Sequence, residues 1–322
     1  MFHLAAAVDP LHLVSDPTGF RASDLLTRAR PDLVGLVVVL GAGGWYLRTR
    51  RRFRRLGETW PDWRSASFGA GLLVVALATL SGLSAFDATS ATIHMVNDTL
   101  MALIAPILLT LGAPLTLARR GSAPPGRARI DAAISSRAVG LLTSPVVTWI
   151  LLGTALAVFY LSGLFQVTVD HRSVDDAVRL ALLAVGLLFC WPAVAADPLP
   201  HPASFPARLI SSFFALPFFL ILGMSLESQN TPIASTLSIS DFHQGAEVMW
   251  STGEFLGILA SIVLLALWIR SEERSAVSRD GSDDVEADAQ LAAWRANRAA
   301  AAMEEALARA TVVKVRPGPD DG

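Results

Sequence analysis

Seven long stretches of the chain are apolar and nearly free of charge, and they decide what the chain can fold into. A helix needs about 20 apolar residues to cross a bilayer, with a usual range of roughly 17–25. Backbone groups in hydrocarbon must bond to one another, which restricts spanning structures to helices and closed barrels. We therefore predict an all-α, polytopic membrane protein with a seven-transmembrane-helix bundle. The predicted spans are 33–47, 67–86, 95–117, 141–164, 177–196, 207–226 and 250–269.

Composition agrees with this class. Of the 322 residues, 17% are charged, against about 25% in a soluble domain. Cys190 is the one cysteine, which excludes an internal disulfide framework and any CxxC metal site. The first residues lack the basic start and apolar core of a cleavable signal peptide, so we expect none. The first span is the shortest, and snorkelling of Tyr46 and Arg48 would extend it.

The arginines orient the predicted bundle. Residues 48–55 hold six arginines, whereas 87–93 and 227–249 hold no Lys or Arg. Cytoplasmic loops carry the excess of Lys and Arg, so the N-terminus is predicted outside and the C-terminus in the cytoplasm. The predicted parts are an extracytoplasmic N-terminal segment, the seven-helix membrane domain and a cytoplasmic C-terminal tail, at 1–31, 32–270 and 271–322 respectively.

The tail differs in composition from the membrane part, being rich in Ala, Glu, Asp and Arg. Residues 280–284 are interpreted as an acidic, turn-like linker, and 290–310 have helix-forming composition. We interpret the tail as solvated and partly helical or disordered. The alternative is a helix on which a partner docks.

Polar side chains stand at the outer mouth of the third span. His94, Asp98 and Met101 fall at i, i+4 and i+7, so they share one helix face. Such groups need a partner, an ion or water, because hydrocarbon offers none. Imidazole and thioether also suit copper, with thioether favouring Cu(I). The alternative is that these are hydrated interface residues and that methionine only fills gaps in the core.

Further polar and sulfur-containing side chains are predicted at the same outer face, among them Met95, Asp241, His243 and Met249. Glu254 stands about one turn inside the last span, where an acid is costly unless it is neutral or paired. Its expected partner is His94 or a bound cation. The alternative is a protonated carboxyl bonded to a backbone carbonyl.

Several enzyme and binding classes have no sequence support. The chain contains no Walker A motif, no GxGxxG opening a helix after a strand, no HExxH and no GxSxG. We therefore expect no catalytic turnover. The arginines lie against the membrane, where they fix topology and meet anionic lipid, so nucleic-acid binding is not expected.

A series of short motifs runs in order from Val34 to Arg274. It includes Trp60-Pro61, His94-Met95, Ala105-Pro106, residues 112–117, Trp191-Pro192, Asp197-Pro198, residues 216–218, Asp241, Met249-Trp250, Gly253-Glu254 and residues 270–274. In this series the chain resembles the CtaG-type cytochrome c oxidase assembly factors, a bacterial membrane family of seven helices linked to copper delivery. The resemblance implies a multi-pass protein of the bacterial plasma (inner) membrane that serves the respiratory chain. Implied partners are cytochrome c oxidase subunits or other copper chaperones.

The chain departs from the family pattern at its histidines. Members usually read His-Met-x-x-His at the start of the third helix, where Asp98 stands here. A His-x-His pair is replaced by Arg179 and Ala181, and a further histidine by Phe219. Asp98 is a harder ligand than imidazole, and Arg179 would repel a nearby cation. His243 is a possible replacement ligand.

Three functions stay open at this point. The first is an assembly factor that handles Cu(I) as a metallochaperone, with His94, Met95, Asp98 and His243 as ligands. Met101, Asp241, Met249 and Glu254 would support that site. The second is a metal-free membrane scaffold for oxidase assembly, whose glycines let helices approach closely. The third is a copper or proton transporter with a polar path.

Overall fold

The computed structural model describes residues 25, 32–200, 203–231, 233–234 and 237–314, and no strand occurs among them. The N-terminal segment predicted over 1–31 therefore lies, except for Leu25, outside the described residues. The elements are α2 (Leu33–Arg55), α3 (Asp62–Leu80), α4 (Leu83–Phe86), α5 (Ala91–Thr99), the π-helical turn η2 (Leu100–Ile104), α6 (Ala105–Leu111), α7 (Pro114–Gly121), α8 (Pro124–Ile134), α9 (Arg137–Leu142), α10 (Pro145–Leu161), α11 (Leu164–Asp170), α12 (Arg172–Val194), α13 (Phe205–Glu227) and α14 (Ile239–Lys314).

Five helical stretches of the described chain are long and apolar enough to cross a membrane. They are Asp62–Phe86, Ala91–Gly121, Arg172–Val194, Phe205–Glu227 and Ile239–Glu273. A sixth arises if α10 and α11, which meet at a bend of 68°, form one broken span. The prediction of an all-α protein with several membrane helices is thus confirmed. α2 covers the first predicted span but is not among the five; its apolar residues give way to arginines from Arg48 onward.

The stretch Ala91–Gly121 is the centre of the bundle. Of its most apolar window, 56% is buried, against 17–39% for the other four spans. Two groups of buried apolar side chains lie against it. We call the first the Phe159 cluster; it joins α5 and η2 to α10, α11, α13 and α14. The second, the Phe68 cluster, joins η2, α6 and α7 to α2 and α3, and α12 contributes to both.

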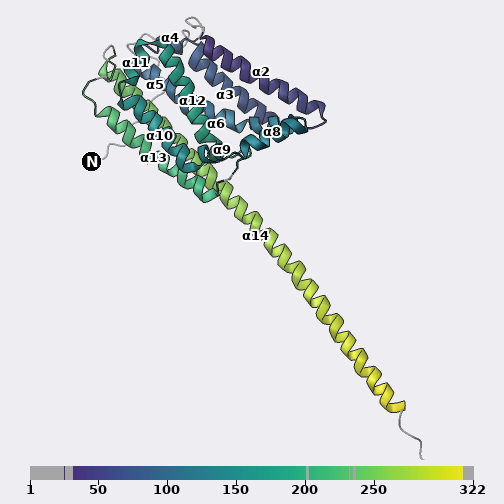
Figure 1. Ribbon diagram of the computed structural model, residues 1–322. Helices are drawn as coiled ribbons and strands as arrows, with labels where there is room; N and C mark the ends of the chain where they lie inside the picture. The colour runs from purple at the N-terminus through teal and green to yellow at the C-terminus, as the bar shows by residue number, and fades with distance from the viewer. Residues whose placement is uncertain (1–24, 26–31, 201–202, 232, 235–236, 315–322) are drawn as a thin grey trace, which may run out of the picture. The chain divides into compact units, whose positions relative to one another are not determined.

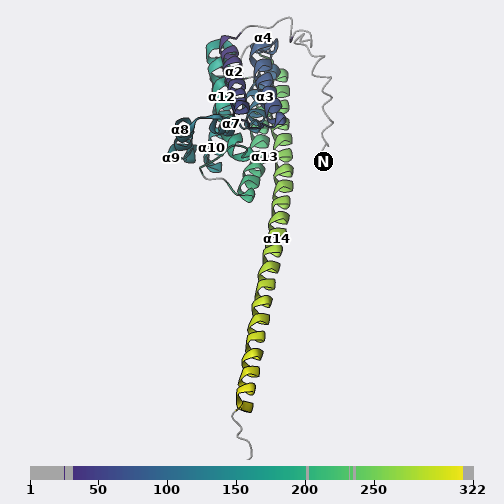
Figure 2. The same cartoon turned by 90° about the vertical axis from the view of Figure 1, so that its right-hand side faces the viewer.

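The turns of the bundle alternate between its two ends. α4 lies at one end and the paired helices α8 and α9 lie at the other, in both views of the molecule (Figures 1 and 2). α2 packs against α3, and α10 packs against α13. The connection before α5, which holds Asp87, and the arginine-bearing helix α8 therefore stand at opposite ends of the bundle.

A π-helical turn interrupts the central stretch just before Pro106. Ala105 donates its N–H to the Leu100 carbonyl, five residues back. Proline has no N–H to donate to the carbonyl four residues before it, which here belongs to Ala102, and its ring crowds that carbonyl. The widened turn relieves this crowding. The freed Ala102 carbonyl faces Gly186 of α12, where a side chain would not fit.

Two acids from distant segments hold the helix starts of the central stretch. Asp241 of α14 accepts hydrogen bonds from the N–H groups of Ala91 (2.6 Å) and Thr92 (3.2 Å) at the start of α5. Asp197, between α12 and α13, accepts from the N–H groups of Leu115 (3.1 Å) and Thr116 (2.6 Å) at the start of α7. Free N–H groups and the helix dipole favour a negative charge at these positions.

The chain divides into two compact units, Met1–Leu264 and Leu265–Gly322. The acidic linker predicted at 280–284 is wrong, because α14 runs through these residues to Lys314. The helix-forming alanines and charged residues around this stretch outweigh the turn signal of one glycine and a few aspartates. The division into compact units does not test the boundary predicted at residue 270 between the membrane domain and the tail, which stays a prediction.

Candidate functional site

Polar and charged side chains gather at the α4 end of the bundle, inside it. His94 and Asp98 come from one face of α5, as their i, i+4 spacing predicts. α5 starts where it does because Ser90 accepts a hydrogen bond from the Ile93 N–H as an N-cap. The other members of this group, which we call the His94 cluster, come from four further segments. They are Asp87 after α4, Tyr160 of α10, Thr168 of α11, and Asp175 and Arg179 of α12.

The imidazole of His94 is surrounded by three carboxylates. Its Nδ1 lies 3.2 Å from Asp87 Oδ2. Its Nε2 lies 3.7 Å from Asp98 Oδ2 and 3.9 Å from Asp175 Oδ1. The ring packs against Phe165, with ring centres 4.8 Å apart, and it is 1% exposed. The apolar rings exclude water, so the imidazole interacts with the carboxylates at short range and low dielectric.

Arg179 is the cation of the cluster. Its guanidinium pairs with Asp87, and it reaches Asp175 Oδ2 at 2.9 Å. The side chain of Arg179 is 4% exposed. Asp87 also accepts a hydrogen bond from Asn97 Nδ2 at 3.0 Å, and Asp98 accepts one from the Tyr160 hydroxyl at 2.9 Å.

Negative charge exceeds positive charge in the cluster. Three carboxylates and one guanidinium sum to −2 with a neutral imidazole, and to −1 with a protonated one. Several buried polar atoms also lack a hydrogen bond, namely His94 Nδ1, Asn97 Oδ1, Asp98 Oδ1, Asp175 Oδ1 and the donor Arg179 Nε. Unpaired buried acceptors are costly, so they mark a place where a cation or a proton would be favourable.

Part of this cluster has the layout of a metal site. Asp87, His94 and Asp175 each offer one ligand atom, and these atoms all lie within 4.8 Å of one another. Their donor set is one imidazole nitrogen and two carboxylate oxygens. Such donors suit Zn²⁺ and other divalent ions better than Cu(I), which prefers sulfur.

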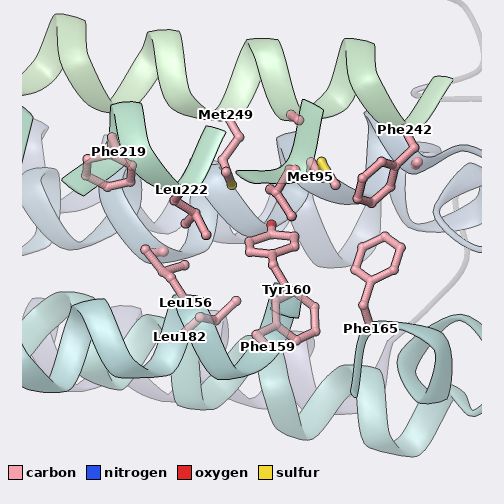
Figure 3. Close-up of a cluster of buried hydrophobic side chains, with 14 of the residues drawn as sticks. Met95, Leu156, Phe159, Tyr160, Phe165, Leu182, Phe219, Leu222, Phe242 and Met249 are labelled. Carbon is pink, nitrogen blue, oxygen red and sulfur yellow. The ribbon is translucent and has the colours of Figure 1, made fainter. Parts of the chain in front are cut away.

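The site residues predicted from the sequence do not all lie in one place. His94 and Asp98 lie together in the His94 cluster. Met95 and Met249 instead lie in the Phe159 cluster, among the side chains of Phe242, Leu222 and others (Figure 3). Both methionines are almost fully buried, so they act there as apolar core residues.

The remaining candidates have other neighbours. Met101 lies in the Phe68 cluster and lines a small pocket that Arg179 also lines. His243 hydrogen-bonds with the Gln229 carbonyl oxygen (3.0 Å) through its Nε2, and Asp241 caps α5. Glu254 is partly exposed, and no described residue is within hydrogen-bond or ion-pair distance of it.

Asp87, Asp175, Tyr160 and Thr168 were not among the site residues predicted from the sequence. The acids had a usable signal, since each stands at a predicted span end on the same side as His94. Tyr160 had a weaker one, as a hydroxyl inside an apolar run. Arg179 pairs with two carboxylates, Asp87 and Asp175, and the prediction that it would repel a nearby cation stays a prediction.

The curated relatives that match the chain are mycobacterial proteins. An uncharacterized protein of Mycobacterium bovis is 27% identical over 281 residues, covering 81% of this chain and 42% of the relative. An uncharacterized protein of Mycobacterium leprae is 28% identical over 285 residues, covering 82% of this chain and 43% of the relative. The chain thus spans less than half the length of the curated relatives it matches. No solved structure matches the chain.

The family comparison is more informative. The profile of the cytochrome c oxidase caa3 assembly factor family matches residues 44–271. This match covers most of the chain and runs from the middle of α2 to the membrane part of α14. It includes every residue of the His94 cluster. The chain therefore belongs to the cytochrome c oxidase caa3 assembly factor family.

Proposed function

We propose that this protein assists the assembly of cytochrome c oxidase as a membrane scaffold that needs no bound metal. The observation that carries the metal-free assignment is the position of Arg179, which pairs with Asp87 and Asp175. These are the two carboxylates of the one three-residue metal-ligand group found among the described residues. No catalytic step is assigned to the protein.

The available donors fit Cu(I) poorly. Cu(I) favours thioether and thiolate sulfur, but Met95 and Met249 lie in the apolar Phe159 cluster. Cys190 is buried in α12 and is not part of the His94 cluster. His94 supplies the only imidazole of the cluster. The carboxylate that contacts this imidazole, Asp87, also pairs with the guanidinium of Arg179.

Co-purification tests the scaffold role. A tagged chain is expressed in its native membrane, and oxidase subunits in the eluate are quantified for wild type and His94→Ala. The exposed His171 lies near the same end of the bundle, so His171→Ala is the matched control. We expect equal recovery of oxidase subunits from all three. Loss of the subunits in His94→Ala alone would contradict a metal-free scaffold.

Copper handling is the second candidate, with Cu(I) as cargo. His94 Nδ1 and Asp98 Oδ1 favour it, because both are buried ligand atoms that make no hydrogen bond. In this role His94, Asp98, Met95 and His243 would serve as an exchangeable ligand set. Purified wild-type protein would then bind about one equivalent of Cu(I), and His94→Ala would lose it. Equal copper content in wild type and His94→Ala rules this candidate out.

We also propose seven crossings in the bacterial plasma membrane, with α2 as the first and the N-terminus outside. This arrangement puts the arginines of 48–55 and of the α7–α9 segment in the cytoplasm. The His94 cluster then lies on the extracytoplasmic side. A periplasm-active reporter fused after Ala88 is expected to be active, and one fused after Arg129 silent. The reverse pattern overturns the orientation.

A further inference from the structure

The guanidinium of Arg179 pairs with two of the three residues of a ligand set suited to a divalent cation. Asp87 Oδ2 serves both Arg179 and His94, at 3.2 Å from His94 Nδ1. Asp175 divides its two oxygens: Oδ2 pairs with Arg179, and Oδ1 points to His94 Nε2 at 3.9 Å. Both carboxylates of the Asp87–His94–Asp175 group are thus held by the same cation.

We infer that Arg179 is a built-in substitute for a metal ion, and that the His94 cluster becomes a divalent-cation site when its guanidinium is removed. The inference rests on the geometry of the cluster and is independent of the role in oxidase assembly. It assigns Zn²⁺-type ions, which take imidazole nitrogen and carboxylate oxygen, as the ligand of the opened site.

Unpartnered atoms supply the second, independent observation. Asp175 Oδ1 and Asp98 Oδ1 are buried and accept no hydrogen bond. The Asp98 side chain is 1% exposed and the Asp175 side chain 9% exposed. Arg179 therefore satisfies the charge of the cluster only in part and leaves oxygen ligands free beside His94.

A pocket lies on the far side of Arg179 from the carboxylates, since its lining includes Arg179 but none of the residues Asp87, His94, Asp98 and Asp175. This small, partly open pocket lies between α2, α3 and α12, and its lining includes Asp32 and Asp176. Truncating the Arg179 side chain would extend this pocket to the two carboxylates that the guanidinium now covers. The two acids in the pocket lining favour entry of a cation.

Zinc binding by purified full-length variants tests the inference. Wild type, Arg179→Ala, Arg179→Lys and Asp87→Asn/Arg179→Ala are dialysed against Zn²⁺, and bound metal and unfolding temperature are measured. We expect about one equivalent in Arg179→Ala alone, with affinity at least about 100-fold above wild type, since a unit charge next to a divalent ion is removed. Zinc is also expected to raise the unfolding temperature of that variant selectively.

Two results would contradict the inference directly. Equal zinc affinity in wild type and Arg179→Ala would mean that Arg179 does not occupy the ion position. Equal affinity in Arg179→Ala and Asp87→Asn/Arg179→Ala would place the ion elsewhere. A further outcome is that Arg179→Ala accumulates in the membrane only when zinc is added. In that case Asp87→Asn/Arg179→Ala is expected to accumulate without zinc, because the unpaired charge of the Asp87 carboxylate has been removed. Failure of the double variant to accumulate would overturn the counter-charge role.

Discussion

Replacing Gly186 by alanine is expected to push α12, which carries Asp175 and Arg179, away from η2, the turn that continues α5. Gly186 lies in α12, seven residues after Arg179, and it faces the carbonyl of Ala102 in η2. An added Cβ would lie 2.2 Å from the Ala102 carbonyl oxygen and 2.7 Å from a ring carbon of Pro106. The carbonyl stands there because Pro106 offers it no N–H.

The size of the effect follows from what must move. Ordinary contact with a Cβ begins at 3.4 Å, so the oxygen and the Cβ must move apart by about 1.2 Å. The obstacle is backbone and a proline ring, neither of which can rotate away. Overpacking a well-packed core costs about 1–3 kcal/mol, occasionally more. We expect Gly186→Ala to lie at or above the upper end of that range, even though alanine favours helix by about 1 kcal/mol over glycine.

Thermal unfolding in lipid nanodiscs, followed by loss of the monodisperse species, measures the change. Gly69→Ala is the matched control, because Gly69 lies in the interior of α3 and no atom of another described segment is within 4 Å of an added Cβ. The control is expected to unfold at or slightly above the wild-type temperature. If both variants unfold at the same temperature, the tight crossing of α12 over η2 is not a stabilising contact, and the argument fails.

Two further variants examine single contacts in the same unfolding assay. Asp241→Ala removes the acceptor for the first N–H groups of α5, and it is expected to lower the free energy of unfolding by about 0.5–2 kcal/mol. The exposed Glu247 lies on the same helix as Asp241, so Glu247→Ala is the control. Equal unfolding temperatures of the two variants would refute the capping role. Tyr160→Phe removes the hydrogen bond to buried Asp98 and is expected to cost about 1–3 kcal/mol. An unchanged temperature for Tyr160→Phe would mean that Asp98 does not depend on the hydroxyl.

The sequence predicted the membrane helices better than their ends and breaks. Apolar runs and arginine-rich segments locate the helices because both follow from the cost of charge in hydrocarbon. The bend between α10 and α11 and the π-helical turn at Leu100 have no such signal. The π-helical turn arises at Pro106 and the bend arises at Ser162–Gly163, and both depend on packing against neighbouring helices. A single apolar run does not encode that packing.

The candidate site was predictable along one helix but not across helices. The spacing of His94 and Asp98 places both on one face, and they do lie together. Periodicity does not say which other segments meet that face, so the contributions of Asp87, Asp175 and Tyr160 required the structure. Met95, one residue from His94, is turned about 100° around the helix, and it packs into the Phe159 cluster.

The contacts that position the cluster are separate from those that set its charge. Asp241 holds the start of α5 near one end of the bundle and Asp197 holds the start of α7 near the other, while Gly186 lets α12 approach between them. None of these three contacts involves Arg179. Variants of the holding contacts should therefore lower stability whether or not zinc is present, whereas Arg179→Ala should lower stability only when no ion replaces the guanidinium. That difference in zinc dependence distinguishes a built-in cation from an arginine that merely packs.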